Sequence, residues 1–196
     1  MKRWADRLGV AVAYAVALAV GWFVAGSHRN WLDWASTNLA NLGDHPVGAM
    51  VVSAFVTEDP PIGWIVLALV GLGATGWVLG AWRTAVLVAT AHVVGTVVSE
   101  GILAYRIHTG TAPVTDRQIL DIGASYLVVC ALVAGIAYSI WPWRIASAVG
   151  FVVVAPNLFG GLPSGEVSSV GHVTSIAVAL ALGWPLARSA RRRLLD

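Results

Sequence analysis

Apolar stretches of about 20 residues dominate this sequence, and they constrain its fold more than any other feature. Breakers such as Pro60-Pro61 and Gly160-Gly161 separate several of them. A chain that is 58% hydrophobic and 11% charged carries more apolar surface than a soluble domain can bury. The pattern therefore predicts an all-α, polytopic membrane protein with six transmembrane helices.

The expected spans are Leu8–Gly26, Ile62–Ala81, Thr84–Tyr105, Ile119–Ile140, Pro142–Leu158 and Val167–Ala187. The first has a basic start like a signal peptide, but no small-residue cleavage site follows, so we expect it to be retained. Residues 30–60 include an apolar run, Val47 to Val56, that is too short to cross a bilayer as a helix. We expect a half-embedded, interfacial loop there, with a seventh crossing as the alternative, and a single domain over residues 1–196.

Basic residues are unevenly distributed between the two sides of the six-span scheme. One side receives Lys2, Arg3, Arg7, Arg83, Arg144, Arg188, Arg191, Arg192 and Arg193. The other receives only Arg29, Arg106 and Arg117. The positive-inside rule then places both termini in the cytoplasm of a multi-pass protein of the plasma membrane, and a seventh crossing would destroy this segregation. The basic tail reads as an orientation signal that contacts lipid headgroups, so we expect no nucleic-acid partner.

Several polar side chains fall within the expected spans at one depth. Counting 1.5 Å per residue puts Ser125, His172 and Glu100 about 8–9 Å below the external surface, on three different helices. Asp121 is nearer the surface and, by i, i+4 spacing, is expected on the helical face of Ser125. His92 is expected to be an outlier, roughly 20 Å from the outer end.

Three chemistries could use this layer. Ser125 and His172 could form a nucleophile and its base, with Glu100 or Asp121 orienting the imidazole. The same groups could instead form a proton or ion pathway. A metal site is less well supported, because no HExxH or comparable spacing occurs and His92 is too deep to join. Purely structural hydrogen bonding of hydroxyls between helices is the remaining alternative.

Two short motifs resemble those of the rhomboid family, the intramembrane serine proteases. Gly123-Ala124-Ser125 resembles the family's GxS nucleophile motif, and Gly171-His172, followed by Ser175 and Ala179, resembles its last-helix motif. Ser36 to Leu42 and His45-Pro46 are similar to segments of divergent actinobacterial rhomboid-like proteins. The resemblance implies a six-helix bundle, a Ser125–His172 dyad, no cofactor, and a transmembrane segment as the substrate.

The sequence also departs from the rhomboid pattern. Tyr126 stands where the family usually has glycine after the serine, and Pro60 and Trp64 stand where an HxxxN pair would help to hold the oxyanion. Losing one oxyanion donor costs on the order of 2.7–4 kcal/mol in a hydrolase. The candidate oxyanion or gate residues that remain are Tyr126, Asn38, Asn41 and His45. The leading function is intramembrane proteolysis; the alternatives are an inactive pseudoprotease that binds transmembrane clients and a small proton- or ion-coupled transporter.

The expected orientation predicts the outcome of cysteine labelling in intact cells. A cysteine placed at Gly161 should react with a membrane-impermeant maleimide, and one placed at Arg144 should not, because the two positions lie on opposite sides of the bilayer. Cys130 is the only natural cysteine and lies within an apolar span, so its background should be low. Labelling at Arg144 but not at Gly161 would show that the orientation is reversed.

Overall fold

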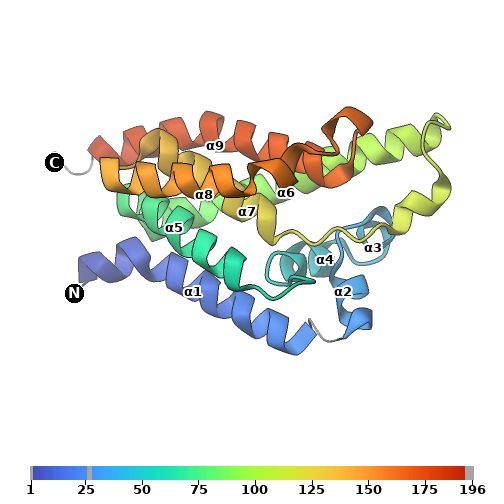
Figure 1. Ribbon diagram of the computed structural model, residues 1–196, viewed down its shortest axis with the longest axis horizontal. Helices are drawn as coiled ribbons and strands as arrows, with labels where there is room; N and C mark the ends of the chain where they lie inside the picture. The colour runs from blue at the N-terminus through green and yellow to red at the C-terminus, as the bar shows by residue number, and fades with distance from the viewer. Residues whose placement is uncertain (1, 26–27, 193–196) are drawn as a thin grey trace.

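A computed structural model describes residues 2–25 and 28–192, with side chains from Arg7 onward. No strand occurs in these residues, and the helices form one elongated bundle (Figure 1). In chain order they are α1 (Lys2–Ala25), α2 (Arg29–Ala35), α3 (Leu39–Asp44), α4 (Pro46–Ser53), α5 (Ile62–Leu79), α6 (Ala81–His108), α7 (Ala124–Tyr138), α8 (Trp141–Phe159) and α9 (Val167–Arg192), with short 3-10 helices at Val114–Gln118 and Leu162–Ser164. The prediction of an all-α, polytopic bundle is confirmed.

Five of the helices, α1, α5, α6, α8 and α9, are long and apolar enough to cross a bilayer. The sixth apolar helix, α7, has 15 residues and is therefore only about 23 Å long. It lies in the middle of the bundle and contacts α5, α6, α8 and α9. From Tyr126 to Ala134 no residue of α7 is more than 8% exposed, so its apolar sequence reflects burial by other helices.

The start of α7 differs from the expected span, which was to begin at Ile119. Residues 119–123 are extended, and the helix begins at Ala124. This segment forms hydrogen bonds with the chain between α2 and α5: the N–H of Thr37 donates to the carbonyl of Asp121 at 2.7 Å, and the N–H of Gly123 donates to the carbonyl of Ser53 at 3.1 Å. Because these bonds satisfy the backbone, the segment has no need to continue the helix.

Residues 29–53 contain three short helices, α2 to α4, at the end of the bundle opposite to the start of α1 and the end of α9 (Figure 1). We call this end of the bundle, which residues 29–53 form, the loop end. Asn38 caps α3 by accepting the N–H of Asn41 at 3.0 Å, and Pro46 opens α4, where its missing N–H costs nothing. Ala35, Ala25, Leu32 and Val56 form a small apolar cluster that anchors the segment to the end of α1.

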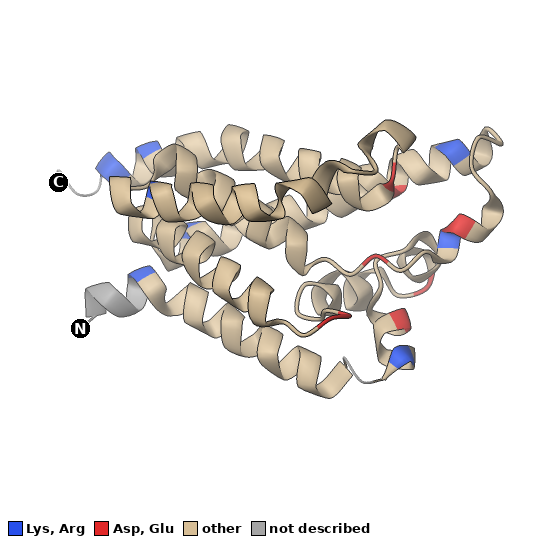
Figure 2. Ribbon diagram, in the orientation of Figure 1, with Lys and Arg blue, Asp and Glu red and all other residues tan. Residues whose placement is uncertain are grey.

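Acidic and basic residues are distributed differently along the bundle. Figure 2 shows acidic residues at the loop end, whereas basic residues lie both there and at the opposite end, near the end of α9. At the loop end Arg29 contacts Asp33 and Glu58 at 3.1 Å each. All three side chains are more than half exposed, so these ion pairs add little stability.

Close contact between α5 and α7 generates a stability prediction. A Cβ on Gly71 would lie 2.9 Å from the backbone nitrogen of Leu132, so Gly71→Ala is expected to lower the free energy of unfolding by about 1–3 kcal/mol through overpacking. Gly101 on α6 is the matched control, since a Cβ there would meet nothing within 4 Å. Thermal unfolding in detergent measures both. Equal midpoints for the two variants would contradict this account of the packing.

Candidate active site

Ser125 lies in the first turn of α7, two residues after Gly123, the residue that precedes the helix. Its side chain is partly exposed, unlike its neighbours Ala124 and Tyr126, which are buried. No side chain caps this helix. The N–H groups of a first helical turn have no partner within the helix, and the helix dipole adds partial positive charge there. Ser125 is therefore accessible at a position that favours negative charge.

His172 lies on α9 with its ring directed at Ser125. Its Nε2 is 2.9 Å from Ser125 Oγ, and its Nδ1 is 3.2 Å from the carbonyl oxygen of Leu158. Leu158 is in the last turn of α8, where a carbonyl has no N–H partner within the helix. The structure thus brings together Ser125 and His172, 47 residues apart in the sequence.

The Leu158 carbonyl determines which nitrogen of the neutral imidazole carries hydrogen. A carbonyl oxygen can only accept, so Nδ1 of His172 donates to it. Nε2 then has a free lone pair and accepts the hydrogen bond from the hydroxyl of Ser125. A backbone carbonyl therefore orients the imidazole in this site, in the place where many serine hydrolases use a carboxylate.

Tyr126 lies behind the histidine rather than beside the serine. It is fully buried, and its ring meets that of His172 edge-on with centroids 5.2 Å apart. Its hydroxyl donates to Asp121 Oδ1 and to the carbonyl of Val167 at 3.4 Å each. The ring occupies the space where a Cβ of Gly171 would lie, which explains why glycine precedes the histidine.

The two acids expected near the dyad contact Tyr126 and the loop end instead of His172. The expectation that Asp121 shares a helical face with Ser125 is wrong, because Asp121 lies in the extended segment before α7. Its Oδ2 accepts the hydroxyl of Thr37 at 3.0 Å, and its N–H donates to Ser36 Oγ at 2.9 Å. Glu100, on α6, is 2% exposed, and its Oε2 has no hydrogen-bond partner.

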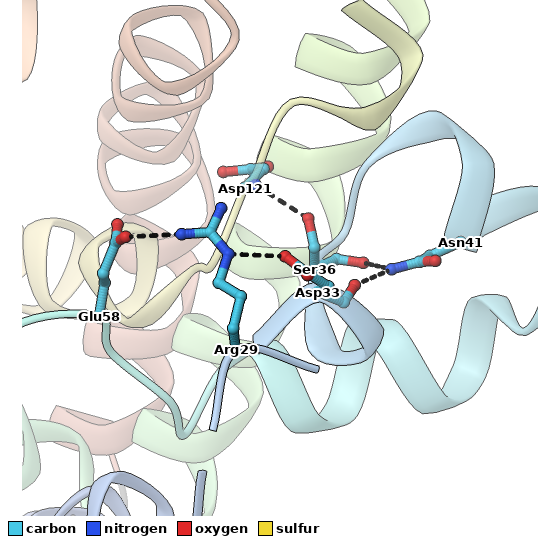
Figure 3. A network of polar contacts seen from close by, with 6 residues as sticks. All are labelled: Arg29, Asp33, Ser36, Asn41, Glu58 and Asp121. Carbon is cyan, nitrogen blue, oxygen red and sulfur yellow. Dashed lines mark hydrogen bonds and ion pairs between the residues drawn. The ribbon is translucent and has the colours of Figure 1, made fainter. Parts of the chain in front are cut away.

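The polar residues of the loop end are occupied by their own segment. Figure 3 shows Asn41 directed at the residues before it, with its Nδ2 donating to the carbonyls of Asp33 at 2.6 Å and Ser36 at 2.8 Å. The side chain of Asn38 caps α3. His45 stacks on Trp34 and its Nε2 donates to the Trp34 carbonyl at 2.9 Å. These contacts hold all three side chains in the structure of the segment itself.

His92 contacts Gly123, two residues before Ser125, although depth counting had placed it far from Ser125. Its Nε2 donates to the carbonyl of Met50 at 2.8 Å, and a Cβ on Gly123 would lie 2.6 Å from its Cε1. Depth counting separated His92 from Ser125 because it assumed a helix from Ile119, whereas α7 begins at Ala124. The signal in the sequence was Gly123 itself, which has to be glycine because the imidazole of His92 occupies its side-chain position.

The side chains that the structure describes include no set of ligands for a metal ion. No group of three or more His, Cys, Asp or Glu residues there could hold a metal ion. The rings of His92 and His172 each contact that of Tyr126, with centroids 6.3 Å and 5.2 Å from it. The arrangement supports nucleophile and base chemistry at Ser125 and His172.

Burial raises the pKa of the Asp121 carboxyl to about 6 from 3.8, although hydrogen bonds from Thr37 and Tyr126 act in the opposite direction. The folded protein then binds this proton more tightly than the unfolded chain. The resulting stabilisation is present below about pH 4 and is lost as the pH rises through about 6. Asp121→Asn should remove roughly 2–3 kcal/mol of this pH dependence. Thermal midpoints of both proteins across that range measure it, and identical pH profiles would contradict the assignment.

Comparison with known proteins agrees with the geometry. A family model described as rhomboid-like protein matches residues 8–193, nearly the whole chain. No curated protein matches the chain. No solved structure matches it either. Because the family model covers α1 from residue 8 onward and every later helix to α9, the chain belongs to the rhomboid-like family of membrane proteins.

Proposed function

We propose that the protein is an intramembrane serine protease in which Ser125 is the nucleophile and His172 the general base. The observation that carries the proposal is the 2.9 Å contact between Ser125 Oγ and His172 Nε2, with Nδ1 held by the Leu158 carbonyl. Ser125 Oγ attacks the scissile carbonyl carbon while its proton passes to His172. The imidazolium then protonates the leaving amine, which leaves an acyl group on Ser125.

Backbone N–H groups provide the oxyanion site in this proposal. The tetrahedral intermediate places its negative oxygen near the nucleophile, and the N–H groups of the first turn of α7 lie there without side-chain caps. Asn38, Asn41 and His45 are engaged in the loop-end segment and are not needed for this role. Asp121 accepts a hydrogen bond from Tyr126, and Tyr126 packs against His172, so Asp121 influences the base only through this tyrosine.

The proposed setting is the plasma membrane, with both termini cytoplasmic and the loop end external. The larger number of basic residues in the segments at the end opposite to the loop end supports this orientation. The substrates are transmembrane segments of other proteins that enter sideways from the lipid, and the chain acts as one domain. Ser125 is partly exposed although its neighbours in the first half of α7 are buried, and this exposure supports access from outside the helix core.

A pseudoprotease that binds transmembrane clients is the second candidate. One observation favours it: the loop side chains that could replace the missing HxxxN pair are hydrogen-bonded within their own segment. Without a side-chain donor the tetrahedral intermediate is less stabilised, and a binder would not need one. A protease requires an activated serine and a client-binding protein does not, so the protease is tested first.

Labelling with a fluorophosphonate probe tests for an activated serine. Wild-type protein in detergent should label, and Ser125→Ala and His172→Ala should each lose labelling by at least about 1,000-fold, as expected for members of one catalytic unit. Ser139→Ala is the matched control, because Ser139 follows α7 at its other end and its hydroxyl donates to the backbone carbonyl of Ala74.

Retention of labelling in His172→Ala would contradict the role of the base. Absence of labelling in a folded wild-type sample would favour the client-binding alternative. Circular dichroism and thermal unfolding of each variant distinguish a lost reaction from a lost fold.

A further inference from the structure

A groove of about 420 Å³ lies between α1 and α6. Val10, Ala13 and Ala17 line it from α1, and Ala85 and Ala89 line it from α6. Three- and four-residue spacing puts each set on one side of its helix. Ala13 and Ala89 are exposed, and both helices are long and apolar enough to cross a bilayer, so the groove opens toward lipid.

The lining of this groove is apolar. Among the described residues that line it, only Tyr14 has a polar side chain, and its hydroxyl donates to the carbonyl of Ala54 at 2.8 Å. Leu72 on α5 and Leu127 on α7 form the floor, since they are only 1% and 6% exposed. A space that offers no hydrogen bond suits a hydrocarbon chain better than water.

Phe55 closes the groove toward the loop end. Its ring packs on that of Tyr14 with centroids 5.5 Å apart, and its carbonyl oxygen occupies the position where a Cβ of Gly21 would lie. The chain at Phe55 therefore rests directly on α1. From Arg7 to Ala17, α1 rises about 15 Å, which is half of a hydrocarbon core of about 30 Å. A transmembrane helix of another protein would have to continue past Phe55, whereas an acyl chain of one leaflet ends at this depth.

The other end of the groove carries groups that suit a lipid headgroup. Arg7 is partly exposed and lies one turn before Val10 on the same side of α1, with its guanidinium carbon 4.6 Å from the ring centroid of Trp77. Trp82 is 77% exposed and lies one turn before Ala85 on α6. Tryptophan is enriched where headgroups meet hydrocarbon, and a guanidinium matches the geometry of phosphate. The charge and the aromatic ring at this end therefore favour an anionic lipid.

We infer that the groove between α1 and α6 binds one acyl chain of an anionic phospholipid from the leaflet at the start of α1, with the lipid phosphate at Arg7. The chain lies along the alanines of both helices and ends at Phe55. It contacts Leu127, two residues after Ser125, so the lipid packs against the helix that carries the serine. This binding is required neither by a protease nor by a client-binding protein, and its test is independent of activity.

Native mass spectrometry of the full chain tests the headgroup, after the protein in detergent is mixed with dioleoyl phosphatidylglycerol or dioleoyl phosphatidylcholine. The wild type should retain one phosphatidylglycerol about fivefold more than phosphatidylcholine, as expected for one basic residue that faces an anionic headgroup. Arg7→Gln should abolish this preference. Arg191→Gln is the matched control and should keep it, because Arg191 is an exposed residue at the same end of the bundle but on α9. Equal retention of the two lipids by the wild type would overturn the inference.

A substitution that fills the groove tests where the acyl chain lies. Ala89→Phe should lower the retained phosphatidylglycerol by at least about tenfold, because the ring takes the space of the chain. Ala104→Phe is the matched control, since Ala104 is also an exposed alanine of α6 but does not line the groove. Equal loss in both variants, or no loss in Ala89→Phe, would overturn the inference. A wild-type dimer that Ala89→Phe dissociates would also overturn it, because a second copy would then occupy the groove. Thermal unfolding verifies the fold of each variant, and Arg7→Gln tests the site without any change in the groove itself.

Discussion

The hydrogen bonds between the loop end and the segment before α7 are the interaction on which the site depends. Thr37, Ser36 and Ser53 satisfy the backbone of Asp121 and Gly123, so the chain can remain extended within the bundle. Buried backbone groups outside a helix need such partners from elsewhere in the protein. The short α7 follows from this arrangement, and with it the position of Ser125 at the start of a helix.

The sequence predicted the helical bundle well because long apolar stretches leave few other folds. It predicted less well where one helix is surrounded by others. The span from Ile119 looked continuous by hydropathy, yet the polar partners that keep residues 119–123 extended lie some 70 to 85 residues away in the chain. Depth counting placed Ser125 and His172 on one level, but it also placed His92 far from the site, because rise per residue says nothing about where a neighbouring helix begins.

The group that orients the imidazole of His172 also could not be predicted from the sequence. Carboxylates are conspicuous in an apolar chain, so Glu100 and Asp121 were natural candidates for the third group. The actual partner, the carbonyl of Leu158, belongs to the backbone, and no residue type marks it. It is available only because α8 ends at Phe159 and the chain turns back into α9. The turn between the last two helices thus contributes to the chemistry through its main chain.

The contact of His92 with Gly123 has a consequence for how this site can vary. The imidazole fills the volume that any side chain at position 123 would require, and Met50 holds the ring in place from the other side. Positions 92 and 123 therefore behave as one steric unit. A larger residue at 123 becomes possible only after a smaller one has appeared at 92, and that order cannot be reversed without displacing the turn that carries the serine.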